Sequence, residues 1–493
     1  MIAERHPLAA PVPWPRPHGR EAYGASDAQR GRNFPKEYRS TLVDVLRRQG
    51  QSKSTAVDKL AQSEAITVTT GQQLGLGLGP LYTVVKIADT IALARALEDR
   101  LKIPVVPVFW LASEDHDAQE INHLWHGGQR FSHTVQPTQH AVGSLPASLA
   151  LPALEGLRQA AKGWHEQEIC DRWLQIYRTS HTLAEAVRAL VFSYFDPQEL
   201  VVLDPNDSAL KQLFQPVLVR EARESLVLNA WNQSKDRFPY PLDRAIAPQT
   251  FNAFVFGTNG ERRYSEDPLE TLHLAETAPE RLSPNALLRP IYQDWILPNV
   301  AYVGGPGEAV YWNQLPAVFE ALGLPLPVFK QRSGATWLSA KGARAWERSG
   351  MDWQTLLAQT PNERKSLQEA AESAAQGPWN EWQSALENGF RVIDAQSRAM
   401  NPQMEVLAAA WRAKMSREQR KWEEHARRWA RENSATAQDR LELFWAEALP
   451  SGIPQERRWT AFWAEVQAGR TFAPQLVESL NPWTSEHLVF TPD

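Results

Sequence analysis

One segment of the chain constrains the fold more than any other, because strand and helix signals alternate within it. Residues 65–70 (AITVTT) are rich in β-branched side chains and predict a strand. A glycine-rich loop follows at 71–79, and a helix is predicted from Pro80 to residue 101. Residues 105–111 (VVPVFWL) form an apolar run typical of a strand that is buried on both faces. This order predicts a βαβ unit with a right-handed crossover, and therefore an α/β fold with a parallel sheet.

Other short apolar runs predict further strands, at 200–203, 299–303 and 326–329. The first of these runs is closed by Asp204-Pro205. A hairpin is predicted where 254–256 and 262–264 flank a turn that carries Asn-Gly. Residues 127–200 have a mostly helical pattern and predict an insertion between strands.

The pattern changes towards the C-terminal end, where apolar side chains step by three, four and seven positions. Before Asn401-Pro402 this spacing is followed by Trp379, Trp382, Leu386, Phe390 and Ile393, and after it by a run from Met404 to Trp429. The spacing predicts an antiparallel two-helix coiled-coil hairpin and leaves intramolecular packing and dimerisation equally open. The predicted organisation is a Pro-rich extended arm (1–35), an α/β core (36–345), the coiled coil (346–440) and a C-terminal segment packed on the core (441–493).

Composition excludes several classes of protein. Lys and Arg total 52 and Asp and Glu total 57, a net charge of −5, so the chain lacks the general basic surface that nucleic acid requires. Cys170 is the single cysteine, which excludes an intrachain disulfide and a cysteine-based zinc site and is typical of a reducing cytoplasm. Its helical, charged surroundings predict a packed, inert thiol. No apolar run is long enough to span a membrane, and the first residues lack a signal-peptide core. We therefore expect a cytoplasmic protein without nucleic-acid or membrane partners.

The loop after the first strand, 71–80 (GQQLGLGLGP), is the first candidate for a ligand site. Its glycines allow close backbone approach, and the following helix N-terminus favours an anion. The loop matches neither the dinucleotide-binding fingerprint nor a Walker A loop. Lys86 lies one to two turns into the helix and can point back towards the loop. A tight turn with close helix packing is the alternative explanation.

A cluster of ionisable residues, 113–117 (SEDHD), follows the buried strand directly. Such groups at a strand end require partners, and they can supply a general base, bind a cation or hold an amine. Asn122 and His123 come shortly after. The spacing matches no standard zinc signature, so a metal is not expected. A solvated acidic loop with a capping Asp is the alternative.

A second glycine turn, 304–307 (GGPG), lies between a predicted strand and a helix that begins near Glu308. Tyr311 follows it, and Arg289, Asp294 and Arg332 lie in flanking segments. Arg332 can pair with a carboxylate or phosphate. These motifs recur at predicted strand ends, the edge of an open α/β sheet where ligands bind. No Gly-x-Ser-x-Gly nucleophile elbow is present.

These motifs, in this order, resemble the bacillithiol-biosynthesis family of cysteine ligases (BshC). The resemblance covers 40–493 and runs through TGQQ (70–73), GPLYT (79–83), Lys86, VVPVFWLASEDHD (105–117), EINH (120–123), LDP (203–205), Arg289-Pro290, Gln293-Asp294, AYVGGPGE (301–308) and QER (455–457). It implies a Rossmann-like core with inserted connecting segments, similar to class I nucleotidyltransferases, and a coiled coil that pairs two protomers. It also implies that L-cysteine is added to the amine of glucosaminyl malate.

From the chemistry of these segments we expect Asp115 or His116 to act as the catalytic base and Lys86 to bind an anion during catalysis. The residues expected to bind substrate or nucleotide are Gln72, Gln73, Gly79, Tyr82, Ser113, Glu114, Asp117, Asn122, His123, Arg289, Asp294, Gly304, Gly305, Gly307, Glu308, Tyr311 and Arg332. The sequence leaves open whether ATP or ADP is used. Two alternatives also stay open: a nucleotidyltransferase-like enzyme that activates another small carboxylic acid, and a non-catalytic binding protein that acts through its coiled coil.

Overall fold

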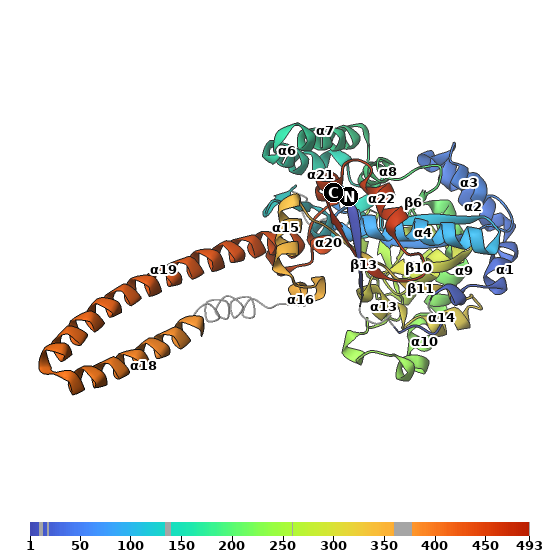
Figure 1. Ribbon diagram of the computed structural model, residues 1–493. Helices are drawn as coiled ribbons and strands as arrows, with labels where there is room; N and C mark the ends of the chain where they lie inside the picture. The colour runs from blue at the N-terminus through green and yellow to red at the C-terminus, as the bar shows by residue number, and fades with distance from the viewer. Residues whose placement is uncertain (9–12, 17–18, 134–139, 259, 359–376, 493) are drawn as a thin grey trace. The chain divides into compact units, whose positions relative to one another are not determined.

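The computed structural model describes residues 1–8, 13–16, 19–133, 140–258, 260–358 and 377–492 (Figure 1). The chain divides into two compact units, one of Met1–Trp337 with Ile453–Asp493 and one of Leu338–Gly452. The first unit contains the strands, and the second is helical.

A five-stranded parallel sheet lies at the centre of the first unit, which confirms the predicted α/β fold (Figure 1). Its order is β11 (Val328–Gln331), β10 (Asn299–Gly304), β2 (Ile66–Gln72), β3 (Val105–Leu111) and β6 (Val201–Leu203). The predicted crossover helix is α4 (Tyr82–Leu101), which connects β2 to β3 and packs on both. Because every strand runs parallel, all five carboxyl ends meet at one edge of the sheet.

Both faces of the sheet are covered, which explains the continuous apolar run of β3. Phe109 and Leu111 pack into one hydrophobic core, whereas Val106, Val108 and Trp110 pack into another. The first core includes side chains of α4, α6 (Leu151–Ala160), α7 (Gly163–Thr179), α8 (Leu183–Phe192), α21 (Ala461–Ala468) and α22 (Phe472–Ser479). The second includes side chains of α2 (Lys36–Leu46), α3 (Thr55–Leu60), α9 (Ser208–Glu224), α10 (Leu226–Ser234), α11 (Pro268–Thr277), α12 (Arg289–Ile296), α13 (Pro306–Trp312) and α14 (Pro316–Ala321).

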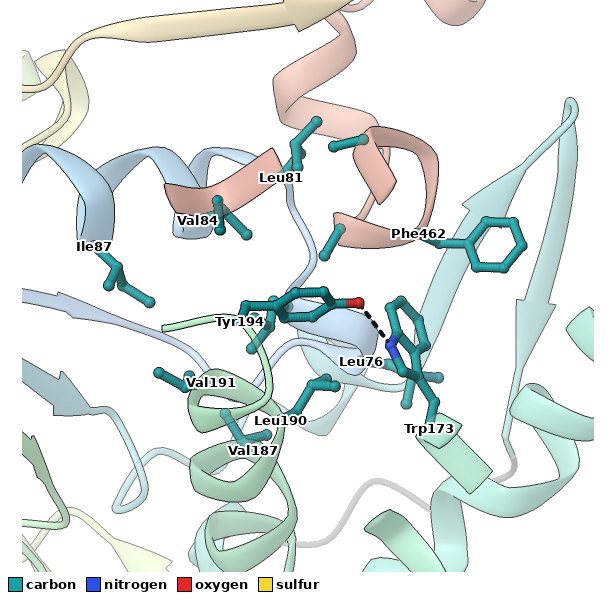
Figure 2. Close-up of a cluster of buried hydrophobic side chains, with 14 of the residues drawn as sticks. Leu76, Leu81, Val84, Ile87, Trp173, Val187, Leu190, Val191, Tyr194 and Phe462 are labelled. Atoms are coloured by element: carbon teal, nitrogen blue, oxygen red, sulfur yellow. Dashed lines mark hydrogen bonds between the residues drawn. The ribbon is translucent and has the colours of Figure 1, made fainter. Parts of the chain in front are cut away.

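The insertion predicted at 127–200 is mainly helical. It includes β5 (Gln129–Ser132), which pairs with β4 (His123–His126), and then α6, α7 and α8. Figure 2 shows how this insertion packs: Trp173 of α7 donates a hydrogen bond to the Tyr194 hydroxyl at 2.8 Å, among Leu76, Val191 and Phe462. Cys170 is buried in the same core, and burial raises the pKa of its thiol to about 12.

The Pro-rich segment 1–35 departs from the extended arm that the sequence predicts. β1 (Ile2–Pro7) pairs antiparallel with β13 (Glu486–Thr491), and β13 pairs with β12 (Gly334–Trp337). A helix, α1 (Ala25–Asn33), forms where prolines are absent. The Asp27 carboxylate accepts the Gly24 N–H at 3.0 Å at its start. The prolines break only part of the segment, and pairing with the distant C-terminal strand orders its beginning.

The predicted hairpin is confirmed as β7 (Ala253–Phe256) and β8 (Arg262–Arg263), and β7 also pairs with β9 (Leu282–Pro284). Residue 259 of its turn lies outside the described residues. Two short helices complete the first unit, α5 (Ala118–Ile121) after β3 and α20 (Gln455–Arg458) before α21.

The second unit contains α15 (Ala340–Ser349), α16 (Trp353–Ala358) and two long helices, α18 (Gly377–Met400) and α19 (Pro402–Ala448). The long helices run side by side in opposite directions, as the predicted coiled-coil hairpin requires (Figure 1). Phe390 packs edge-to-face on Trp411, and Arg412 pairs with Asp394 at 2.5 Å. The predicted turn is also observed, because the Asn401 side chain caps α19 by accepting the Met404 N–H. Residues 359–376 and the Trp379 and Trp429 side chains lie outside the described part.

Candidate active site

A cavity of about 620 Å³ lies at the carboxyl edge of the parallel sheet. Residues at the ends of all five strands, or one or two positions after them, line it, namely Gln72, Ala112, Pro205, Gly305 and Arg332. Its other lining residues are Gly71, Gln73, Tyr82, Trp110, Glu114, Asp115, His116, Glu120, Ile246, Phe254, Arg262, Tyr264, Pro284, Asn285, Ala286, Arg289, Tyr302, Pro306, Gly307, Glu308, Tyr311 and Arg457. The tertiary structure thus brings the three sequence motifs to one cavity.

The two glycine loops have different environments. In the first loop, 74–79 is buried, and a Cβ on Gly77 would stand 2.4 Å from the Trp173 ring. Gly77 has a positive φ of 64°, and a Cβ on Gly79 would stand 2.9 Å from Thr460. Close packing within the protein therefore accounts for these glycines. In the second loop, Gly305 and Gly307 border the cavity, and a Cβ on Gly307 would meet open space.

Lys86 is fully buried beneath the cavity, and its ammonium has three acceptors. It donates to the Gly71 carbonyl at 2.5 Å, to Glu308 Oε2 at 2.7 Å and to Gln72 Oε1 at 3.2 Å. Burial lowers the pKa of Lys86, and the Glu308 charge counteracts this effect. Lys86 is therefore placed to hold the two loops together by positioning Glu308.

Glu308 is the second half of this arrangement. Its carboxylate also accepts the Tyr302 hydroxyl at 2.6 Å and the Gly305 N–H at 2.8 Å. Burial alone would raise its pKa, but Lys86 and these hydrogen bonds outweigh burial and lower it. Glu308 is therefore an ionised group that is hydrogen-bonded to the second glycine loop at Gly305.

Asp115 and His116 are joined by Arg262, which comes from β8. Arg262 Nη1 lies 3.2 Å from Asp115 Oδ1 and 2.9 Å from His116 Nδ1, and the guanidinium stacks over the Phe254 ring. Asp115 also accepts hydrogen bonds from the Gln73 amide and the His116 N–H. Burial raises the pKa of Asp115, but the hydrogen bond from Gln73 and the charge of Arg262 outweigh it and lower the pKa.

Glu114 pairs with Lys211 and not with Arg262, the cation that pairs with Asp115. It forms a buried ion pair with Lys211 of α9, whose ammonium also donates to the Leu282 carbonyl at 2.6 Å. Burial raises the pKa of Glu114, and Lys211 counteracts it. The neighbouring Ser113 hydroxyl donates to Asp204 after β6 at 2.5 Å. The ion pair of Glu114 with Lys211 and the hydrogen bond of Ser113 to Asp204 hold the turn after β3 in place.

Besides Arg262, three more arginines line the cavity, and they differ in their partners. Arg332 pairs with Glu456 of α20 at 2.7 Å and lies over the Tyr82 ring. Arg289 contacts Gln293 at 3.1 Å and the Tyr311 hydroxyl at 3.4 Å. Among the described residues, no carboxylate forms an ion pair with Arg289 or Arg457. These two guanidinium groups are therefore available for an anionic ligand.

Twelve of the predicted site residues line this cavity, and eight do not. Lys86, Gly79 and Ser113, described above, are three of these eight. Gly304 lies against the Phe329 ring, and Asp294 forms a buried ion pair with Arg30. Burial raises the pKa of Asp294 to about 6. The remaining three do not line the cavity either: Asp117 caps α5, Asn122 follows α5, and His123 is the first residue of β4.

Several lining residues were not among those predicted. Arg262, Phe254 and Tyr264 come from the hairpin β7–β8, for which the sequence predicted only strand pairing. Phe254 and Tyr264 lie with their ring centroids 4.0 Å apart and form an aromatic wall. Arg457 lies on α20, and Glu120 lies on α5. Glu120 and Arg457 lie in two segments of the family resemblance, EINH (120–123) and QER (455–457). The signal for Arg262 was the charged pair Arg262-Arg263 in a short strand beside an Asn-Gly turn.

Within the part of the chain that the structure describes, no group of three or more His, Cys, Asp or Glu side chains is arranged to hold a metal ion. Among the same residues, no helix combines the length and the apolar composition needed to cross a bilayer.

Two family models match the chain. The one described as "Bacillithiol biosynthesis BshC, N-terminal Rossmann-like domain" matches residues 16–333, and the one described as "Bacillithiol biosynthesis BshC, C-terminal coiled-coil domain" matches residues 335–492. Together they span both compact units.

Similar proteins carry the name "Putative cysteine ligase BshC". One from Geobacillus thermodenitrificans is 29% identical over 507 residues, covering 92% of this chain and 90% of that protein. One from Flavobacterium johnsoniae is 26% identical over 478 residues, with the same coverage of 92% and 90%. One from Cytophaga hutchinsonii is 35% identical over 319 residues, covering 60% of this chain and 59% of that protein. With a Rossmann-like parallel sheet, a coiled coil and both family models matched in order, the chain belongs to the BshC family of bacillithiol biosynthesis.

Proposed function

We propose that the cavity joins L-cysteine through an amide bond to the amine of glucosaminyl malate. The names of the similar proteins support cysteine as one substrate, and the family models support the bacillithiol pathway. The observation that carries the proposal is the pair of guanidinium groups, Arg289 and Arg457, that line the cavity without a carboxylate partner among the described residues. Malate is a dicarboxylate, and two free guanidinium groups suit its two charges.

The second glycine turn supports the other half of the reaction. Forming an amide from a carboxylate requires an activated acyl group, whose leaving group is anionic. Gly305 and Gly307 border the cavity, and the Gly305 N–H at the start of α13 donates to the ionised Glu308 carboxylate. We expect the activated acyl group to lie beside the open glycines of this turn rather than against the first glycine loop, whose glycines are packed against the protein.

The direct test is product formation by the full-length protein. Purified protein is incubated with glucosaminyl malate and cysteine, with and without ATP and magnesium, and the products are followed by mass spectrometry. A cysteinyl conjugate supports the proposal, and its dependence on nucleotide tests the role of the second glycine turn. Absence of the conjugate under every condition, from a folded protein, contradicts the proposal. Release of pyrophosphate with an acid other than cysteine would instead favour the nucleotidyltransferase alternative.

We further propose that the coiled coil pairs two copies of the chain. Trp422, Leu407 and Val406 of α19 expose 64%, 62% and 70% of their surface, although their apolar side chains favour burial. A second copy of the same hairpin offers the same apolar surface, so a twofold contact buries both. Sedimentation of the full-length protein measures this directly, and a monomer at micromolar concentration contradicts it.

A further inference from the structure

Four carboxylates line the cavity, and three of them are compensated by a cation. Glu114 pairs with Lys211, Asp115 with Arg262, and Glu308 with Lys86. The fourth, Glu120, has no hydrogen-bond or ion-pair partner for its carboxylate among the described residues. The cavity thus presents a single uncompensated carboxylate, opposite in charge to the two free guanidinium groups.

The side chain of Glu120 is exposed at the cavity, and its surroundings raise the pKa of its carboxyl group. Burial raises the pKa of Glu120, and the negative charges of Asp117 and Asp115 raise it further. The Glu120 charge helps to raise the pKa of Tyr82 of α4, and Arg457 of α20 lines the same cavity. A carboxylate with a raised pKa accepts a proton more effectively than an ordinary one.

The two residues that the sequence suggested as bases are engaged otherwise. Asp115 accepts from Gln73, Arg262 and a backbone N–H, and these contacts stabilise its ionised form. His116 presents Nδ1 to Arg262, and a guanidinium has only donors, so this nitrogen carries a lone pair. The proton of the neutral ring is then on Nε2, which makes the imidazole a hydrogen-bond donor.

We propose that Glu120 takes the proton from the substrate ammonium and so produces the free amine that attacks the acyl group, an assignment that rests on the proposed function. In this step an N–H bond of the ammonium breaks and its electron pair stays on nitrogen. The proton moves to the Glu120 carboxylate, which becomes a neutral carboxylic acid. Before transfer, the same carboxylate attracts the ammonium, while Arg289 and Arg457 hold the malate carboxylates at other points of the cavity.

The test compares Glu120→Gln with Glu168→Gln, an exposed glutamate of α7 that does not line the cavity. Both changes remove one charge and preserve size, and thermal unfolding checks that both proteins fold. We expect E120Q to lower kcat for the conjugate by about 100-fold, the usual scale of general-base catalysis, and to change KM less. E168Q should match the wild type.

The pH profile separates proton transfer from a structural role. The wild-type rate should reach its plateau at lower pH than the E120Q rate, which should keep rising as solvent deprotonates the amine. The deficit of E120Q should therefore shrink at alkaline pH, and Glu120→Asp should recover part of the activity. A wild-type rate and profile in E120Q, or a deficit that is constant with pH, overturns the assignment. Absence of conjugate from the wild-type protein overturns the proposed function, and the assignment with it.

Discussion

The cavity and the coiled coil differ in where their charged side chains lie: ion pairs are buried around the cavity and exposed along the coiled coil. Around the cavity, charged side chains are buried in pairs, such as Lys86 with Glu308 and Arg332 with Glu456. Along α18 and α19 the ion pairs lie at the surface, as Arg398 with Glu405 does, and large apolar side chains are exposed instead. Buried pairs fix geometry because a lost partner leaves a charge without solvent, whereas surface pairs exchange readily with water. We infer that chemistry depends on charge placement in the first unit and association depends on the apolar surface of the second.

The largest expected effect comes from removing one charge of a buried pair. Glu308→Gln keeps one acceptor oxygen, for either Tyr302 or Gly305, and leaves the Lys86 ammonium buried without its counter-charge. We therefore expect a loss of about 3 kcal/mol in the free energy of unfolding. The matched change in the coiled coil, Asp394→Asn, breaks an exposed pair with Arg412 and should cost less than about 1 kcal/mol. Urea unfolding measures both. Equal losses of unfolding free energy in the two variants would contradict the difference between the buried and the exposed ion pairs.

The next effect is on substrate binding. Arg289→Ala removes a guanidinium that has no carboxylate partner among the described residues, and we expect KM for glucosaminyl malate to rise about 10- to 100-fold, the scale of a charged hydrogen bond. Arg412→Ala, at the surface of the coiled coil, is the matched control and should leave KM unchanged. Steady-state kinetics by mass spectrometry gives both values. An unchanged KM in R289A would assign the malate site elsewhere in the cavity.

A third effect concerns the response of the first unit to acid. Burial lowers the pKa of His487 to about 4, although Glu456 opposes the shift and Arg332 and His6 favour it. In the unfolded chain this histidine has an ordinary pKa near 6.5. Between pH 6.5 and pH 4 it is therefore protonated in the unfolded chain and neutral in the folded protein. The contribution of this group to stability is therefore complete above pH 6.5 and is lost as the pH falls towards 4, by about 3 kcal/mol.

His487→Gln removes this contribution while retaining a hydrogen-bonding group near Thr336. The difference between wild-type and variant unfolding curves, measured from pH 7 to pH 4, isolates the residue. This subtraction is needed because His133, with a pKa also lowered to about 4 by burial, acts in the same direction, and Asp294 acts in the opposite one. A pH-independent difference would contradict the buried neutral state of His487.

The smallest effect on chemistry should come from the coiled coil. Trp422→Glu places a charge on the exposed apolar surface of α19, so we expect the sedimentation coefficient to fall from that of a dimer to that of a monomer. The kcat of the monomer should stay within about twofold of the wild type, because no residue of Leu338–Gly452 lines the described cavity. A monomer without activity would show that the coiled coil contributes to catalysis.

Much of the fold could be predicted from local patterns. The strand 105–111 is observed with the same bounds, and the crossover helix and the hairpin β7–β8 also form as predicted. Each of these depends on periodicity or turn chemistry within a few residues. The order of residues 2–7 could not be predicted, because their partner is β13 at the other end of the chain.

For the candidate site, the sequence by itself determined which segments meet. Motifs at the ends of parallel strands share an edge of the sheet, so Gln72, Glu114 and Gly305 converge whatever their separation along the chain. The tertiary structure alone decided the partners. It joined Arg262 to Asp115 and Lys86 to Glu308, and it left Glu120 uncompensated. Periodicity is a local property that sequence records, whereas ion pairing and burial depend on atoms brought together from distant segments, and these select the groups that remain available for substrate.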